Sequence, residues 1–248
     1  MKVKTILVSQ PEPKSLSSPY HELARKQKIS VDFRPFIHLE SVSAAYVRQK
    51  KVPFKGHTAV ILTSRNAADH YFRICEEMRF EVPTSMKYFC MSEAIAFYLQ
   101  KYITYRKRKI YYGKQRFLDL ISIIKKHKSE KFLLPSSDLL KPLIPQLLDD
   151  NEINYTRAVL YKTVCSDLSD LEDVFYDILV FFSPSGIKSL LQNFPNFKQN
   201  NTRIAAFGKT TAKAVKDAGL KVDIEAPSAK APSMTMAIEQ YIKKINKK

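Results

Sequence analysis

Short apolar runs alternate along the chain with segments whose apolar residues recur at helical spacing. The runs are rich in β-branched and aromatic residues, and most end in Ser, Thr or Gly. They predict strands over 4–9, 58–62, 87–90, 109–112, 132–134, 177–182, 203–207 and 222–225. The intervening segments predict helices near 19–26, 63–78, 92–102 and 117–124, one ending near 148, and others near 183–193, 208–218 and 232–245. Repeated strand–helix units favour parallel sheets with helices on both faces.

The chain also contains an internal repeat. The sequence ILTSRNA over 61–67 resembles VFFSPSG over 180–186, so Ser64 and Ser183 hold equivalent positions. The next strand–helix unit repeats at nearly the same offset, at 90–91 and 207–208. Such a repeat predicts two similar halves, each a small doubly wound domain.

The units before the first copy of the repeat are too few to form a domain. We therefore expect residues 1–34 to join 166–248 in domain 1 and residues 40–152 to form domain 2, with linker strands over 35–39 and 153–165. The extended runs 31–39 and 155–164 would cross side by side. The predicted fold is α/β, with two small doubly wound, flavodoxin-like parallel-sheet domains joined by a two-stranded antiparallel hinge.

Composition adds one strong feature to this picture, a formal net charge of +17. Hydrophobic residues make up 45% of the 248, which is enough for a normal core. The charge favours an anionic partner, and nucleic acid, a membrane surface, a polycarboxylate or a phosphate all remain open, as does a role in solubility alone. No apolar run approaches the roughly 20 residues of a membrane helix, and residues 1–8 lack signal-peptide features. We expect a cytoplasmic protein without a membrane partner.

Metal and nucleotide chemistry have little support in the sequence. The three cysteines are far apart and form no C-x-x-C pair, and the five histidines show no H-x-x-x-H spacing. The stretch Gly208-Lys209-Thr210 resembles the end of a phosphate-binding loop, but Arg203 stands where that loop requires glycine. We therefore expect neither a metal nor an organic cofactor.

The turns after the predicted strands are better candidates for a binding site. Open parallel sheets bind ligands beyond the carboxyl ends of their strands, where helix N-termini offer free N–H groups to anions. These turns carry Thr63 and Ser64, Ser136 and Ser137, Ser183 and Ser185, and Thr210 and Thr211. The same residue types favour plain helix capping, which remains the alternative for each turn. The basic and aromatic stretch 101–112 fits either a nucleic-acid surface or a solvated helix end.

Taken in order, several of these motifs resemble the uroporphyrinogen-III synthase family over nearly the full length. They are Thr63-Ser64-x-x-Ala67, Leu134-Pro135-Ser136, Val159-Leu160-Tyr161-Lys162-Thr163, Phe182-Ser183-Pro184-Ser185-Gly186, Ala206-Phe207-Gly208-x-Thr210-Thr211-Ala212 and Ala231-Pro232-Ser233. The resemblance implies closure of the linear tetrapyrrole hydroxymethylbilane to uroporphyrinogen III, with inversion of ring D, in haem biosynthesis. It also implies an interdomain cleft, no cofactor, an anionic small-molecule substrate, no nucleic acid and a monomeric protein.

The resemblance carries site residues over by position. Tyr161 matches the family tyrosine that assists loss of the substrate hydroxyl, and its alternative role is a half-buried aromatic on a hinge strand. The predicted substrate-binding residues are Thr63, Ser64, Asn66, Ser136, Ser183, Ser185, Thr211 and Ser233.

One turn departs from the family pattern. Over 90–94 the chain reads CMSEA, so that Ala94 replaces an expected threonine and Met91 an expected glycine. Besides the synthase, this leaves open a non-catalytic tetrapyrrole-binding or regulatory relative. A nucleic-acid-binding protein is a third alternative, which a continuous external stripe of positive charge would favour.

Overall fold

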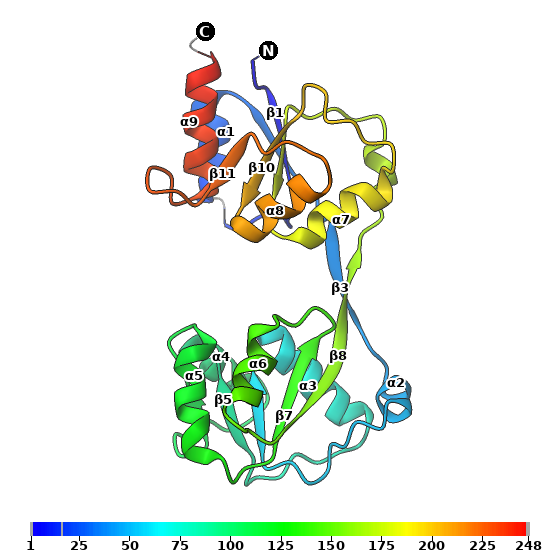
Figure 1. Cartoon of the computed structure of the whole chain (residues 1–248), viewed down its shortest axis with the longest axis vertical. Coiled ribbons are helices and arrows are strands. Elements are labelled where there is room, and N and C mark those ends of the chain that lie inside the picture. The colour runs from blue at the N-terminus through cyan, green and yellow to red at the C-terminus, as the bar shows by residue number, and fades with distance from the viewer. Residues whose placement is uncertain (1, 16, 247–248) are drawn as a thin grey trace. The chain divides into compact units, whose positions relative to one another are not determined.

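The computed structural model describes residues 2–15 and 17–246, and the chain divides into two compact units (Figure 1). Unit 1 comprises Met1–His38 and Val164–Lys248, and unit 2 comprises Leu39–Thr163. No helix among the described residues is long and apolar enough to cross a membrane.

Unit 1 is built on a five-stranded parallel sheet in the order β11-β10-β9-β1-β2. The strands are β1 (Thr5–Val8), β2 (Ser30–Phe33), β9 (Ile178–Phe181), β10 (Arg203–Phe207) and β11 (Ile224–Ala226). Counted within the unit, this is the 2-1-3-4-5 order of flavodoxin-like sheets. Helices α1 (Pro19–Gln27) and α9 (Met234–Asn246) pack against each other, as do α7 (Pro184–Asn193) and α8 (Lys209–Asp217).

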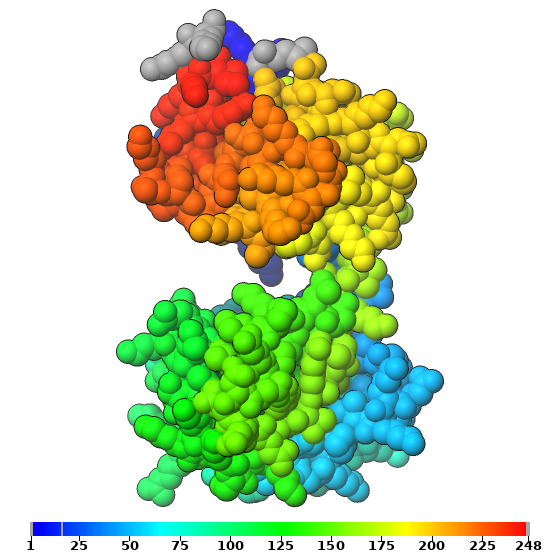
Figure 2. All heavy atoms as spheres, in the orientation of Figure 1, coloured from blue at the N-terminus to red at the C-terminus, as the bar shows by residue number. Residues whose placement is uncertain are grey.

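Strand β9 shows why this sheet is covered on both faces. All four of its residues are buried, and they alternate between two cores. Ile178 and Val180 pack into the core that includes residues of α1 and α9, whereas Leu179 and Phe181 pack into the core that includes residues of α7 and α8. Alternation of side chains along a strand thus turns a continuous apolar run into two half-cores. In Figure 2 the later residues, yellow to red, form most of the visible surface of this unit.

Strand β1 comes from the other end of the chain and takes an interior position in this sheet, between β9 and β2. A single carboxylate fixes its start: Asp177 Oδ2 accepts hydrogen bonds from Lys4 N at 2.8 Å and Thr5 N at 3.0 Å. The Asp177 N–H in turn donates to Thr5 Oγ1 at 3.1 Å. Because Asp177 is only 8% exposed, these bonds form where water competes little. They set the pairing of β1 with β9, two strands that are far apart in the sequence.

Unit 2 has a six-stranded sheet in the order β3-β8-β7-β4-β5-β6, in which β4 to β8 are parallel. Its strands are β3 (Ile37–Ser41), β4 (Ala59–Leu62), β5 (Lys87–Cys90), β6 (Ile110–Tyr112), β7 (Phe132–Ser137) and β8 (Tyr155–Cys165). Unit 2 is thus a doubly wound sheet, as expected, and its strand order differs from the 2-1-3-4-5 order of unit 1. After β4 the chain adds β5 and β6 on one side and returns to the other side for β7 and β8.

Helices also cover both faces of the unit 2 sheet. Residues of α2 (Ala44–Gln49), α3 (Arg65–Glu77) and α4 (Glu93–Tyr98) share one core, and residues of α5 (Phe117–Ile124) and α6 (Leu143–Asp150) share the other. Strand β4 alternates between them, with Val60 and Leu62 in the first core and Ala59 and Ile61 in the second. Short 3-10 turns occur at Leu99–Lys101, Lys125–His127 and Ser169–Leu171.

Both segments expected as linkers have more structure than predicted. Strand β8 pairs with β7 from Tyr155 to Tyr161, so most of the expected linker 153–165 is a sheet strand of unit 2. The expected single run 31–39 is two strands, β2 and β3, separated at Pro35, which has no N–H to donate. Bonds from Val42 N to Leu160 O (3.1 Å) and from Ser166 N to Phe36 O (2.9 Å) show that β3 and β8 run antiparallel.

The Asp177 carboxylate yields a stability prediction. Substitution Asp177→Ala leaves two backbone N–H groups without their acceptor at a buried position, so the free energy of unfolding should fall by about 3 kcal/mol. Urea unfolding followed by circular dichroism measures the change. Asp217→Ala is the control, because Asp217 forms an exposed i,i+4 pair with Lys213, and its removal should cost less than about 1 kcal/mol. Equal losses for the two variants would contradict the role given to Asp177.

Candidate functional site

In unit 2, the point where the chain changes direction along the sheet lies between β4 and β7. Ligands bind at such switch points, beyond the carboxyl ends of the strands. Strand β4 is followed there by Thr63 and Ser64, and β7 ends at Ser137. Tyr161 lies opposite Ser137 on the next strand, β8. We call residues 63–66, 137–138 and 161 the unit 2 rim.

The clearest contact in the unit 2 rim joins Tyr161 to Ser64. Their hydroxyl oxygens are 3.5 Å apart, and Tyr161 is only 7% exposed. Burial raises the pKa of the Tyr161 phenol; the contact with Ser64 partly opposes this shift, and the carboxylate of Asp138 adds to it. The phenol is therefore protonated at neutral pH and is a competent proton donor.

The serine of this pair also begins a helix. Ser64 has extended backbone angles and is the N-cap of α3, its Oγ accepting a hydrogen bond from Ala67 N at 3.0 Å. This is the capping role that the turn pattern left open, and it leaves the Ser64 proton available to donate. Thr63 is half-buried beside it, and Asn66 is exposed on the first turn of α3. The structure thus brings Thr63, Ser64, Asn66 and Tyr161 to one place.

A second ring, missed by the sequence analysis, lies against Tyr161. The imidazole of His70 is stacked on the Tyr161 ring, with centroids 4.5 Å apart and planes 15° apart. Its Nδ1 lies 3.3 Å from Ser41 Oγ. The only sequence signal was spacing: His70 follows the buried Ala67 by three residues and precedes the buried Tyr71 and Ile74, which puts it at the edge of the buried face of α3.

Ser136 occupies a different role from the one predicted by its turn. Its side chain is 1% exposed, and its Oγ accepts a hydrogen bond from Arg157 Nε at 3.0 Å. Arg157 Nη2 then donates to the carbonyl oxygens of Ser137 and Asp138, at 2.9 Å each. Ser136 therefore helps to hold the turn of the unit 2 rim through Arg157.

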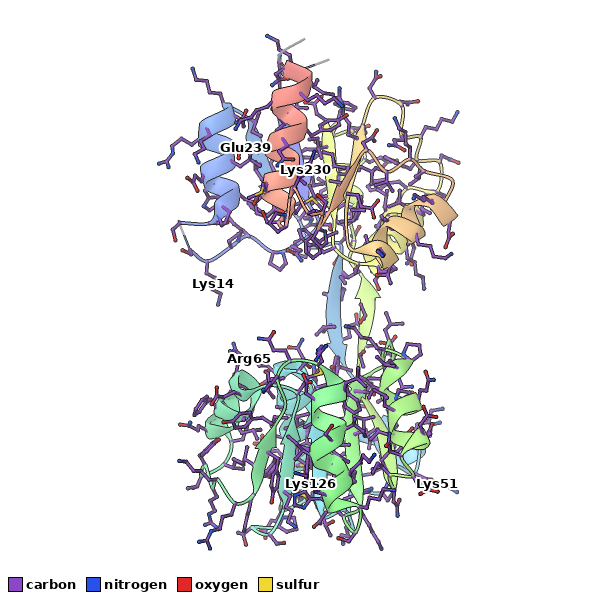
Figure 3. All side chains as sticks on the ribbon, turned by 60° about the vertical axis from the view of Figure 1, so that its left-hand side comes forward. Lys14, Lys51, Arg65, Lys126, Lys230 and Glu239 are labelled. Carbon is purple, nitrogen blue, oxygen red and sulfur yellow. The ribbon has the colours of Figure 1, made fainter. Side chains whose placement is uncertain are left out.

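A cationic residue of the unit 2 rim was also missed. Arg65 is exposed at the start of α3, and its guanidinium lies over the Tyr98 ring at 5.3 Å from the centroid. Figure 3 labels Arg65 at one end of unit 2 and Lys51 and Lys126 toward the opposite end. Sequence spacing gave no indication of this pair, because Tyr98 lies on another helix, α4.

Asp69 fixes the tyrosine beneath Arg65. Its Oδ1 accepts hydrogen bonds from Tyr98 Oη at 2.7 Å, from Lys101 Nζ at 3.1 Å and from the Tyr102 hydroxyl. Partial burial acts to raise the pKa of the Asp69 carboxyl, but donation by Tyr102, Tyr98 and Lys101 outweighs it and lowers that pKa. Asp69 is therefore ionised at neutral pH and holds the Tyr98 ring in place under the guanidinium.

The turn that departs from the family pattern is well packed. Met91 is half-buried and contacts both cores of unit 2, and its N–H donates to Leu62 O at 2.9 Å. A Cβ at Gly113 would lie 3.3 Å from Met91 O and 3.0 Å from Leu120 N, so close backbone approach occurs at the end of β6 instead. Ala94 is exposed on the first turn of α4 and offers no hydroxyl.

Unit 1 has its own switch point, between β1 and β9, beside the N-terminus of α7. Ser183 is the N-cap of α7, its Oγ accepting from Gly186 N at 3.3 Å, and Ser185 is half-buried in the same turn. On the neighbouring strand, β10 leads to Gly208 (φ 85°), where α8 begins without a side-chain cap. We call residues 183–185 and 208–211 the unit 1 rim.

Two predicted residues of unit 1 differ in how their hydroxyls are used. Thr211, on the first turn of α8, is 1% exposed, and its Oγ1 has no hydrogen-bond partner among the described residues. Ser233 is exposed, and its Oγ already accepts from Met236 N at 3.2 Å at the start of α9. The free hydroxyl belongs to Thr211, although its side chain is buried.

Within 2–15 and 17–246, no group of three or more His, Cys, Asp or Glu side chains is placed to hold a metal ion. The three cysteines are free thiols. Burial raises the pKa of both Cys75 and Cys90 to about 12, which keeps them unreactive at neutral pH.

Comparison with known proteins shows which family the chain resembles. The family model described as uroporphyrinogen-III synthase HemD matches residues 18–236. The uroporphyrinogen-III synthase of Saccharomyces cerevisiae is 29% identical over 139 residues, which cover 50% of this chain and 50% of the yeast protein. The match thus spans about half the length of that curated relative.

Two solved structures have the same fold. Uroporphyrinogen-III synthetase from Helicobacter pylori has a TM-score of 0.60 at 18% identity, covering 97% of this chain and 99% of its own. A mutant uroporphyrinogen III synthase from Thermus thermophilus has a TM-score of 0.57 at 12% identity, covering 99% and 100%. Because the family model spans most of the sequence, the chain belongs to the uroporphyrinogen-III synthase family.

Proposed function

We propose that this protein is an active uroporphyrinogen-III synthase, which closes hydroxymethylbilane to uroporphyrinogen III with inversion of ring D. The observation that carries the proposal is the protonated, buried Tyr161 phenol beside Ser64 at the switch point of unit 2. Membership of the family and the order of the motifs support it.

In the proposed reaction Tyr161 acts as the acid. Its hydroxyl donates a proton or hydrogen bond to the departing hydroxyl of the substrate, which leaves as water. The raised pKa of the Tyr161 phenol means that it is protonated at neutral pH, as a donor to the departing oxygen must be. Ser64 orients the Tyr161 hydroxyl, since its own lone pair is engaged with Ala67 N.

The acetate and propionate groups of the substrate require partners for negative charge. In the unit 2 rim, we propose the N-terminus of α3 with Thr63, Ser64 and Asn66, together with the Arg65 guanidinium. In the unit 1 rim, we propose the N-termini of α7 and α8, with Ser183, Ser185 and Thr211. The absence of a side-chain cap on α8, which lies wholly within the described part of the chain, leaves its first N–H groups available to a carboxylate.

The remaining predicted residues take smaller parts in this proposal. Ser136 acts through Arg157 by holding the 137–138 turn. Ser233 stays a prediction, because its hydroxyl already caps α9. We further propose a monomeric, cytoplasmic enzyme that needs no metal or organic cofactor and binds no nucleic acid. The net charge of +17 suits a substrate with many carboxylates.

A non-catalytic tetrapyrrole-binding relative is the second candidate. The observation in its favour is Ala94, which stands at the start of α4 without the threonine hydroxyl expected there. Such a protein would bind the tetrapyrrole but leave its closure to the uncatalysed path. Product analysis separates the two candidates.

The first experiment supplies fresh hydroxymethylbilane, oxidises the product and resolves the type I and type III isomers. The wild-type protein should give mainly type III, and Tyr161→Phe should lower kcat by about 100-fold with little change in KM, because the proton donor is lost. The matched control is Tyr155→Phe, which removes a hydroxyl from the first residue of the same strand, β8. It should retain wild-type kcat.

Type I product at the uncatalysed rate, from a folded wild-type protein, would overturn the synthase proposal and favour the binding relative. Type III product with equal kcat in wild-type and Tyr161→Phe proteins would keep the synthase and remove Tyr161 from its mechanism.

Arg65 gives a separate prediction about substrate binding. Arg65→Gln removes a cation from the unit 2 rim while keeping a side chain of similar length. Loss of one exposed charge-assisted contact should raise KM about fivefold and change kcat by less than about twofold. Arg79→Gln is the control, because Arg79 is exposed just beyond the other end of α3. An unchanged KM in Arg65→Gln, or an equal rise in both variants, would exclude Arg65 as a carboxylate partner.

A further inference from the structure

His70, which is stacked on the proposed proton donor Tyr161, has no role in the proposed reaction. The rings are nearly parallel at a centroid separation of 4.5 Å, which is direct face-to-face contact. Tyr161 is 7% exposed, so the imidazole covers a ring that is otherwise surrounded by protein. A phenol held in this way has little freedom to turn about its ring axis or to tilt.

The position of His70 is itself well fixed. Its Nδ1 lies 3.3 Å from Ser41 Oγ at the end of β3, which is within hydrogen-bonding distance. One turn further along α3, Arg73 Nη2 donates to the carbonyls of Val42 at 2.7 Å and Leu160 at 3.5 Å. Because Leu160 directly precedes Tyr161, Arg73 ties α3 to the strand that carries the phenol.

The contacts of the Tyr161 side chain determine where its hydroxyl lies. Within the described part of the chain, two groups contact this side chain by specific geometry: Ser64 at 3.5 Å from the hydroxyl and His70 against the ring. The Ser64 contact is long, and a long hydrogen bond constrains direction weakly. The ring contact therefore constrains the position and tilt of the phenol ring, whereas the Ser64 contact bears on the direction of the hydroxyl proton.

We propose that His70 is a positioning residue for Tyr161, holding the phenol by ring stacking so that its hydroxyl faces the reacting group of the substrate. This inference rests on the proposed synthase function. His70 donates no proton to the substrate and acts only through Tyr161. Burial and the neighbouring Arg73 lower the pKa of the His70 imidazole, which favours its neutral form at pH 7.

Three substitutions of His70 distinguish the effect of a flat aromatic ring from the effect of side-chain volume alone. His70→Ala removes the stack and should lower kcat about tenfold while KM changes by less than about twofold, because a misdirected proton donor affects only the chemical step. His70→Phe keeps a flat ring and should restore kcat to within about threefold of wild type. His70→Leu fills similar space without a ring and should resemble His70→Ala.

The matched control is His127→Ala. His127 is also a partly buried histidine packed on aromatic rings of unit 2, with its centroid 4.5 Å from that of Tyr111 and 5.3 Å from that of Phe89. Its removal should disturb packing to a similar degree and leave kcat unchanged. Circular dichroism confirms that each variant folds.

A second measurement reports the stack without any turnover. In a proton NMR spectrum, the His70 ring protons should be displaced by the ring current of Tyr161, and Tyr161→Leu should abolish that displacement. An undisplaced His70 signal in the wild type would contradict the stacked geometry and overturn the inference.

The kinetic outcomes distinguish this inference from the function on which it rests. A wild-type protein that forms only type I product would overturn the synthase proposal and the role of His70 together. An active wild type with unchanged kcat in His70→Ala, or with His70→Leu restored as fully as His70→Phe, would overturn the role of His70 alone. Selective recovery by phenylalanine supports ring stacking as the cause.

Discussion

The insertion of β1 between β2 and β9 is the interaction on which the architecture depends. A strand from the start of the chain becomes central to a sheet otherwise built from residues beyond 177, apart from β2, and Asp177 holds its first residues by two backbone hydrogen bonds. Unit 1 therefore consists of two segments of the chain, and the whole of unit 2 lies between them in the sequence. The excursion requires two strands to carry the chain out and back, and β3 and β8 do so as an antiparallel pair. The switch point between β1 and β9, and with it the unit 1 rim, exists only because β1 lies there.

Strands buried on both faces were the most predictable part of the fold. The predicted bounds 87–90 and 203–207 coincide with β5 and β10, because a strand covered by helices on both sides is apolar after its first residue, and the change from the charged Lys87 or Arg203 marks its start. Helix α2 was missed, since six residues leave little room for a periodic signal. The strand order of unit 2 also could not be predicted from local sequence patterns. The sequence determines that β7 follows α5, but only packing decides that β7 lies beside β4 and not beside β6.

The residues of the candidate site also differ in whether their roles depend on local sequence or on contacts with distant elements. Ser64 and Ser183 were found because capping a helix is a local requirement, met by the residue at its start. His70 and Arg65 were missed because each acquires its role by facing an aromatic ring on another element, at Tyr161 and Tyr98 respectively. Ser136 looked like Ser64 in sequence, yet its side chain points into the protein toward Arg157, since a strand alternates its faces and the turn begins one residue later than the pattern suggests.

The departures at Met91 and Ala94 bear on substrate contact more than on acid chemistry. A methionine at the end of β5 is accommodated because it packs into both cores of unit 2, while close backbone approach has moved to Gly113 at the end of β6. The phenol of Tyr161, its Ser64 partner and the stacked His70 come from β8, from the turn after β4 and from α3, and not from the turn over 90–94. Binding a carboxylate calls for donors at helix ends and cations at the rim, and it does not require a buried, protonated phenol stacked on a second ring. The arrangement around Tyr161 is thus the physical reason to prefer catalysis over binding alone.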